Sequence, residues 1–192
     1  TRLVSDWSSD VCSSDLTPGS VPIARLDLDP DLGPNPEWVP PQAGSDPERL
    51  RPTKIREALA SLTSPQVEPC LVHGDPWPGN VIWDRGELVA LIDWEEACAA
   101  DPVLDLGIAR LDLRWAFGVE AMRTFTDHYR AISGRDLATL PYWDLRALLR
   151  PVWNLGEWAS VYPGFGRSDI DEAHLAEVHQ DHLDEVLASL GQ

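Results

Sequence analysis

Three oxygen-bearing side chains, those of Asp75, Asn80 and Asp93, are spaced so that they could bind one metal ion. A short apolar strand is predicted to end at Val72, and the loop that follows carries His73, Asp75 and Asn80 among stiffening prolines and glycines. A hairpin then returns the chain, so that Asp93 comes at the end of a second strand. Because this order of elements brings the loop beside the end of the returning strand, we expect the three side chains to converge.

Carboxylate and amide oxygens are hard ligands that suit Mg²⁺, which completes its shell with water and phosphate oxygens. The segment from position 71 to 107 holds no cluster of His or Cys, so zinc and iron are not favoured. His174, His179 and His182 fall close together on a predicted helix, but a solvated polar face explains them better than a metal site. Glu95 and Glu96 likewise indicate a solvated acidic turn rather than a site for a cationic ligand.

The chain is strongly acidic: 15 Lys and Arg against 32 Asp and Glu give a net charge of −17 and a pI near 4.4. Such a field repels phosphate backbones, and we expect no nucleic-acid partner. No apolar run approaches the roughly 18 residues that a membrane span needs, and no basic start precedes an apolar stretch. We therefore expect no membrane anchor and no signal peptide, and predict a cytoplasmic protein.

The apolar periodicity predicts an α+β fold that is mainly helical, with a small β-hairpin element near its start. Strands are expected at 70–72, 81–83 and 88–92, with a glycine-containing hairpin turn between the last two. Helices are expected from Pro52 to before Pro65, from Asp101-Pro102 to Gly118, from there to Gly134, and over 142–160 and 171–190.

Two of these helices carry more specific expectations. On the helix that ends at Gly134, the inward stripe is predicted to consist of Phe125, Tyr129 and Ile132. The helix over 142–160 is predicted to continue through Pro151 with a kink.

The first part of the chain reads differently. Residues 1–16 have neither helical nor strand periodicity, and Ser-Ser-Asp occurs twice within them. This segment resembles a translated sequencing adapter more than a natural disordered terminus, and we exclude it from the fold. Residues 17–47 contain eight prolines and three glycines, which indicates an irregular segment. The folded domain is therefore predicted over 48–192.

The segment from position 73 to 107 resembles the central motif of the aminoglycoside phosphotransferase and choline kinase-like families, relatives of the protein kinases. Those families carry H-x-D-x-x-x-x-N in a catalytic loop and a metal-binding Asp thirteen residues after the Asn. Here His73 and Asp75 are followed by Asn80, five residues after Asp75, and by Asp93, thirteen residues after Asn80. Three elements at matching spacing make this resemblance specific.

The resemblance implies ATP-dependent transfer of a phosphoryl group to a hydroxyl of a small molecule, such as an aminoglycoside-like antibiotic or an amino-alcohol metabolite. At the catalytic centre, Asp75 would orient the acceptor hydroxyl and take its proton, and His73 would brace the loop. Asn80 and Asp93 would hold the Mg²⁺ that bridges the phosphates of ATP or GTP. Asp105 would tie the backbone of the loop to the following helix.

The resemblance covers only the C-terminal lobe of a protein-kinase-like fold. Such kinases also need a strand-rich N-terminal lobe, with a glycine loop over the phosphates and a lysine that grips them. The sequence contains no G-x-G-x-x-G or P-loop pattern, and its single lysine, Lys54, is predicted on a helix before the loop. We therefore expect the N-terminal lobe to be absent, the chain to be a truncated fragment, and the isolated fragment to be inactive.

Two other functions stay open. A non-catalytic, kinase-like binding scaffold would be favoured by the loss of Asp75 or Asp93, but both are present. A metallophosphoesterase would share the Gly-Asp and Gly-Asn pieces of the loop, but it needs a histidine after the asparagine, where Val81 stands.

The partner is expected to be a small hydroxylated molecule, and the acidic chain favours a cationic one. Aromatic side chains near carboxylates bind amines through cation–π contact and charge. Trp153, Trp158 and Tyr162, with Asp144 and Glu157 nearby in sequence, have this composition. Packing in the core nevertheless explains them better.

Overall fold

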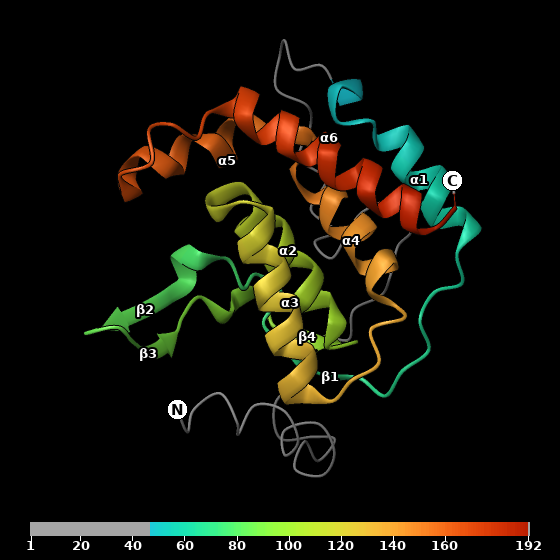
Figure 1. Ribbon diagram of the computed structural model, residues 1–192, viewed down its shortest axis with the longest axis horizontal. Coiled ribbons are helices and arrows are strands. Elements are labelled where there is room, and N and C mark those ends of the chain that lie inside the picture. The colour runs from blue at the N-terminus through green and yellow to red at the C-terminus, as the bar shows by residue number, and fades with distance from the viewer. Residues whose placement is uncertain (1–46, 192) are drawn as a thin grey trace.

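Helix α1 (Pro52–Ser61) opens the helical body of the protein (Figure 1). The structure is a computed structural model, and it describes residues 47–191. A proline suits its first turn, where no backbone N–H is needed, and a 3-10 turn, η1 (Pro47–Leu50), precedes it. Its buried residues include Ile55, Ala58 and Leu59, which lie on one helix face, and the helix falls within the predicted range. The two segments expected over 1–16 and 17–47 lie outside the described residues, apart from position 47.

The described strands form two antiparallel ribbons. Strands β2 (Val81–Asp84) and β3 (Glu87–Leu91) make the predicted hairpin, whose turn at Arg85 and Gly86 has φ angles of 50° and 83°. Strand β1 (Cys70–Val72) is also as predicted. Its partner, β4 (Cys98–Ala100), was not predicted, because three residues are too few to show an alternating pattern.

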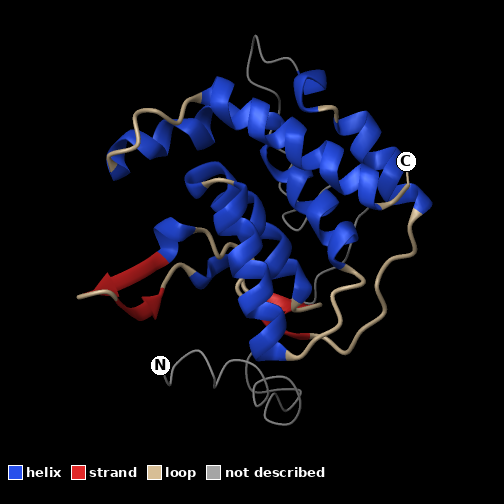
Figure 2. Cartoon of the chain, viewed as in Figure 1, coloured by secondary structure: helices blue, strands red, loops and turns tan. Residues whose placement is uncertain are grey.

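The β2–β3 hairpin stands away from the helices (Figures 1 and 2). Its side chains are exposed although several are apolar: Ile82, Trp83 and Val89 are 42%, 62% and 50% exposed. An uncovered two-stranded ribbon is held mainly by its own ladder and turn, and such ribbons are marginally stable in water.

Helix α2 (Val103–Phe117) runs through the centre of the body, and its apolar residues Leu104, Ile108, Leu111 and Trp115, which recur at helical spacing, are fully buried. Its start is fixed by Asp101, because the Oδ1 atom accepts a hydrogen bond from the Val103 N–H at 2.9 Å. The helix ends before Gly118, as predicted.

Helix α3 (Val119–Ser133) departs from the prediction. Tyr129 packs against the core as predicted, but Phe125 and Ile132 are exposed, and the buried residues are Met122 and Thr126. Adjacent helical residues differ by about 100° in direction, so burial of Thr126 leaves Phe125 in solvent. Thr126 can occupy this place because its hydroxyl accepts from Arg110 Nη1 at 2.6 Å and donates to the Met122 carbonyl at 2.7 Å.

The helix predicted over 142–160 is two helices rather than one kinked helix. Helix α4 (Leu140–Leu149) ends at a 3-10 turn, η4 (Arg150–Trp153), and α5 (Leu155–Val161) follows. Pro151 has no N–H to donate to the preceding turn, and its ring disfavours a continuous helix. A further 3-10 turn, η5 (Tyr162–Phe165), leads towards α6 (Glu172–Ser189), which occupies most of the predicted range 171–190.

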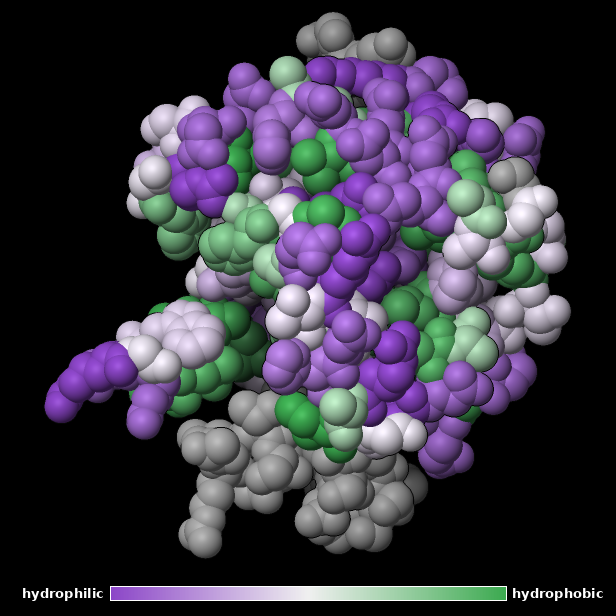
Figure 3. All heavy atoms as spheres, in the orientation of Figure 1, coloured by the Kyte–Doolittle hydropathy of each residue, from purple (hydrophilic) through white to green (hydrophobic). Residues whose placement is uncertain are grey.

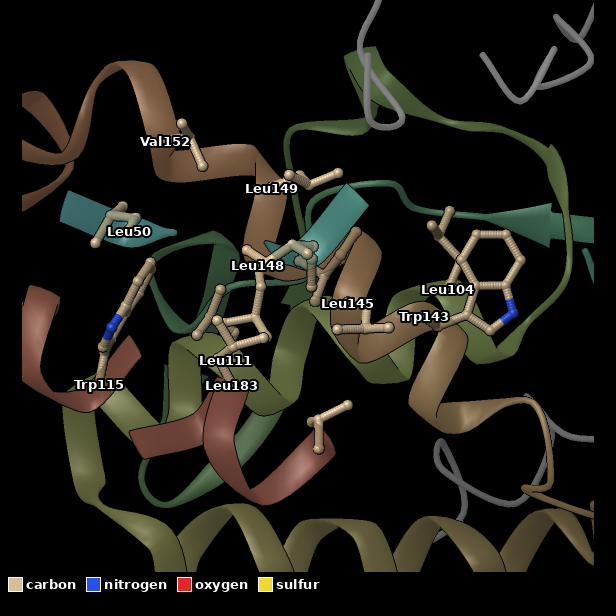
Figure 4. Close-up of a cluster of buried hydrophobic side chains, with 14 of the residues drawn as sticks. Leu50, Leu104, Leu111, Trp115, Trp143, Leu145, Leu148, Leu149, Val152 and Leu183 are labelled. Carbon is tan, nitrogen blue, oxygen red and sulfur yellow. The ribbon is translucent and has the colours of Figure 1, made fainter. Parts of the chain in front are cut away.

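The core lies where α2, α4 and α6 pack together, with α1 against α4 (Figure 1). Figure 4 shows its leucines filling the space between Trp115 and Trp143. Helices α2 and α4 approach closely because Gly107 has no side chain: a Cβ there would lie 2.8 Å from the main chain of Trp143. The described residues thus form a mixed, mainly helical fold with small sheets, in agreement with the predicted class at this level.

A buried polar network links the helices. Asp144 of α4 accepts from Arg110 of α2 at 2.8 and 3.0 Å, and Arg114 donates to Glu185 of α6 at 2.8 and 2.9 Å. Arg114 also lies 3.1 Å from Nδ1 of His182. Because arginine can only donate, that nitrogen accepts.

The predicted solvated face of histidines on α6 is wrong for two of its members. His179 and His182 are fully buried, because they lie on the same helix face as Leu175 and Leu183. His179 donates from Nε2 to the Leu148 carbonyl at 2.8 Å.

The space-filling view shows a mostly hydrophilic face over α3 and α6, with green, hydrophobic residues along the hairpin (Figure 3). In residues 47–191, every helix is too short or too polar to cross a bilayer.

Candidate active site

Strand β1 delivers the loop from His73 to Asn80, which we call the 73–80 loop. Because β1 pairs with β4, Val72 lies opposite Cys98, and the start of the loop therefore meets the turn η3 (Trp94–Glu96). Contact is so close that a Cβ on Gly74 would collide with the main-chain oxygen of Glu96, and Gly74 itself has a φ of 85°. The loop and the turn after Asp93 thus come together, as the sequence predicts.

His73 is fully buried and uses both ring nitrogens to shape the loop. Its Nδ1 atom accepts the Asp75 N–H at 3.2 Å, and Nε2 lies 2.8 Å from the Ile92 carbonyl, to which it must donate. These partners select one neutral tautomer. The ring also contacts Trp94, with 4.6 Å between centroids. This geometry suits a brace between the loop and the end of β3.

Asp105, in the first turn of α2, holds the loop backbone from the other side. Its carboxylate accepts the N–H of His73 at 2.7 Å and that of Gly74 at 2.9 Å. Burial raises the pKa of this carboxyl, and the two amides oppose that effect by stabilising its charged form. The loop is therefore anchored to α2 in the manner that the family resemblance implies.

Asp75 and Asn80 contact each other directly. The Asn80 side-chain amide donates to the Asp75 carbonyl at 2.9 Å and to Oδ2 of its carboxylate at 3.1 Å. Arg150 of η4 donates to the other oxygen, Oδ1, at 2.9 Å and to Glu96 at 3.3 Å. The side chain of Asp75 is 28% exposed, so its carboxylate can still be reached by a ligand.

Asp93 lies at the end of β3, next to Asn80: the main-chain oxygen of Asn80 accepts the Ile92 N–H at 2.9 Å. Asp93 has a left-handed backbone, with φ 65° and ψ 61°, and an exposed side chain. Aspartate tolerates this conformation better than most residues, and such strain is often found at functional sites.

The donor set fits a hard cation. The Asn80 side-chain nitrogen donates to two acceptors on Asp75, which leaves the Oδ1 atom of Asn80 for a ligand. Asp93 adds a carboxylate on the neighbouring strand end. Residues 47–191 contain no group of three or more His, Cys, Asp and Glu arranged to hold a metal ion. One amide and one carboxylate suit Mg²⁺, which can take its other ligands from phosphate and water.

Two residues of this neighbourhood were missed at the sequence level. Arg150 follows Asp75 by 75 residues, and no local pattern marks it. Asp112 is buried on α2; burial raises its pKa to about 7, Arg150 opposes this, and the charge of Asp75 adds to it. The prediction of a solvated turn is wrong for Glu96, because this residue pairs with Arg150.

Several aromatic residues that follow α4 pack against the core. Trp158 lies edge-on to Trp115 at 5.6 Å, and the guanidinium of Arg150 lies 5.4 Å from its ring centroid. Tyr162 is buried in the core, and Asp144 is engaged by Arg110. Core packing thus accounts for much of this group, while Trp158 also reaches a residue that contacts Asp75.

Comparison with known proteins agrees with this motif. Residues 24–149 match the model of the phosphotransferase enzyme family, APH, well over half of the chain. The uncharacterized protein YcbJ of Bacillus subtilis (strain 168) is 25% identical over 122 residues, which are 63% of this chain and 34% of YcbJ. The chain therefore spans about a third of the length of this curated relative. The match begins inside the segment 17–47 and ends one residue before Arg150. This chain belongs to the phosphotransferase enzyme family.

Proposed function

We propose that this chain supplies the catalytic loop and the magnesium ligands of an enzyme that transfers a phosphoryl group from ATP or GTP to a hydroxyl of a small molecule. The observation that carries the proposal is the contact of Asp75 with Asn80 beside the strand end that bears Asp93. It joins a carboxylate open to an acceptor with two oxygen donors for a cation.

The chemistry that we assign to Asp75 is positional and acid–base. Its carboxylate accepts a hydrogen bond from the acceptor hydroxyl, which aims the oxygen at phosphorus. As the new O–P bond forms and the bond to the leaving nucleotide breaks, the hydroxyl proton passes to Asp75. In a loose transition state this proton leaves late, so orientation matters more than basicity.

The remaining residues prepare this step. Asn80 and Asp93 would hold Mg²⁺, which neutralises charge on the nucleotide phosphates when bound. His73 and Asp105 keep the loop in place through the hydrogen bonds described above. None of these groups needs to change its protonation for the transfer.

We further propose that the acceptor is an amino alcohol or an aminoglycoside-like compound and that the enzyme is cytoplasmic. A net charge of −17 attracts cationic acceptors. The single lysine of the sequence, Lys54, lies on α1, which packs against α4, and it is exposed. A lysine that grips phosphates must then come from outside this sequence, so we expect this chain alone to bind MgATP weakly and to turn over slowly.

The test is phosphoryl transfer from MgATP to a panel of amino alcohols and aminoglycosides, detected by mass spectrometry after long incubation. Asp75→Asn should lower product formation by at least about a hundredfold, because general-base residues contribute this much or more. Asp84→Asn, on the exposed hairpin, is the matched control and should leave the rate unchanged. Equal rates for wild type and Asp75→Asn would overturn the proposal.

A further inference from the structure

Arg150 is the first residue of η4, at the break between α4 and α5, and its Nη2 atom bridges two carboxylates. It lies 2.9 Å from Oδ1 of Asp75 in the 73–80 loop and 3.3 Å from Oε2 of Glu96 in η3. One guanidinium nitrogen therefore ties the loop to the turn that follows Asp93. In the proposed function, the loop carries the proton acceptor Asp75, and the turn comes directly after the metal ligand Asp93.

The surroundings hold Arg150 in this place. Its side chain is only 10% exposed, and the guanidinium lies over the ring of Trp158 at 5.4 Å. Removing one partner of a buried ion pair lowers the free energy of unfolding much more than removing one partner of an exposed pair. Asp75 stays 28% exposed, so Arg150 does not close off the carboxylate. This arrangement fits a support better than a gate.

Charge explains why a support is needed. Arg150 also faces the buried carboxyl of Asp112, whose charge acts on it together with those of Asp75 and Glu96. Without a cation at this point, these carboxyl groups would repel one another. The carboxylate of Asp75, partly exposed, would be the group most able to turn away.

We propose that Arg150 is a positioning residue of the phosphotransferase: it fixes the orientation of the Asp75 carboxylate for the acceptor hydroxyl. The proposal rests on the proposed function, because it assigns Asp75 as the proton acceptor. Arg150 acts through Asp75 and is not itself placed on the reacting atoms.

The first test measures the orientation of Asp75 without any activity. Oδ2 of Asp75 accepts from the Asn80 side-chain amide, so a freely turning carboxylate exposes that amide to water. In Arg150→Met, exchange of the Asn80 side-chain amide with water, followed by NMR, should become about tenfold faster, since a charge-assisted hydrogen bond is lost. The main-chain amide of Gly74 is held by Asp105 and serves as the internal control.

Arg150→Lys keeps the charge and should restore most of the protection. Unchanged exchange at Asn80 in Arg150→Met would overturn the proposal, and so would an equal acceleration at Gly74, which would mean general loosening. If Arg150→Met does not fold, Glu96→Gln removes the second anchor of Arg150 and should give a smaller acceleration at Asn80 alone.

The second test is kinetic and separates this proposal from the proposed function. With an acceptor that the wild type phosphorylates, Arg150→Met should lower kcat about tenfold or more and leave KM for MgATP nearly unchanged, with partial rescue by Arg150→Lys. A rise in KM alone would overturn the positioning role. Equal rates for wild type and Asp75→Asn would overturn the proposed function, while the exchange result still decides whether Arg150 holds Asp75.

Discussion

Gly74 is the point at which the 73–80 loop leaves no room for a side chain. It combines a φ of 85° with direct contact to the main-chain oxygen of Glu96. Gly74→Ala should therefore lower the free energy of unfolding by about 3 kcal/mol, from backbone strain plus overpacking. Urea denaturation measures this value.

Gly86, in the hairpin turn, is the matched control for that substitution. Its φ is 83°, but nothing lies within 4 Å of an added Cβ. Gly86→Ala should lower the free energy of unfolding by only about 1 kcal/mol, because backbone strain is the only unfavourable effect there. Equal losses for the two variants would show that the contact with Glu96 does not constrain the loop.

Sequence reasoning finds the residues of the loop but not the residues that reach it from elsewhere. The family spacing of Asp75, Asn80 and Asp93 could be read directly, because loop and hairpin are contiguous in the chain. Arg150 and Asp112 could not be predicted in this way, because tertiary packing brings Arg150 from η4 and Asp112 from α2 to the loop. Asp112 interrupts an apolar helix face, and this is the one signal that could have marked it.

At the scale of elements, the crossing of α2 and α4 depends on Gly107. Alanine is favoured over glycine in helices by up to about 1 kcal/mol. At Gly107, however, the added Cβ would lie 2.8 Å from the backbone of Trp143. We expect Gly107→Ala to lower the melting temperature, because the helices must separate at a cost of about 1–3 kcal/mol.

Gly156 in α5 offers the opposite case. A Cβ there meets only the end of the flexible Glu172 side chain, at 3.0 Å. Gly156→Ala should therefore raise the melting temperature slightly, by the helix-propensity gain. A loss of stability at Gly156 comparable to that at Gly107 would argue against the tight helix crossing as the cause.

Periodicity predicted the elements well wherever one apolar face dominates. Helix α2 and the hairpin follow from regular patterns and their turn residues. Helix α3 does not, because both Phe125 and Met122 are apolar and only the bond from Arg110 to Thr126 decides which face is buried. Strand β4 forms because β1 is beside it, which is information that its own three residues do not contain.

At the scale of the whole molecule, two buried groups make stability depend on pH in opposite directions. Burial lowers the pKa of His179 to about 4, with a smaller effect from the charge of His182, while the bond to the Leu148 carbonyl opposes it. Between pH 6.5 and 4 the unfolded chain binds a proton that the native state does not. His179 therefore reduces stability as the pH falls through this window, by about 1.4 kcal/mol per pH unit.

Asp112 acts in the reverse sense. Its pKa of about 7 lies above the ordinary value of 3.8, so the native state binds the extra proton between these pH values. Stability from this group is lost as the pH rises towards 7.

Urea titrations at several pH values should separate the two effects. Relative to wild type, His179→Gln should gain stability as the pH is lowered from 6.5 to 4, and Asp112→Asn should gain it as the pH is raised from 4 to 7. Parallel stability curves for a variant and wild type would remove that residue as a source of the dependence.

The exposed turn of the hairpin is a site where the chain can be cleaved while the fold stays together. The side chain of Arg85 is 90% exposed, at the tip of a ribbon that the helices do not cover. Among residues 47–191, trypsin should therefore cut first after Arg85. The two pieces should migrate together on a sizing column, because β1 stays paired with β4 and α1 stays packed on α4 across the cut. A protein that can be nicked and remain whole in this way could be produced as two complementing halves.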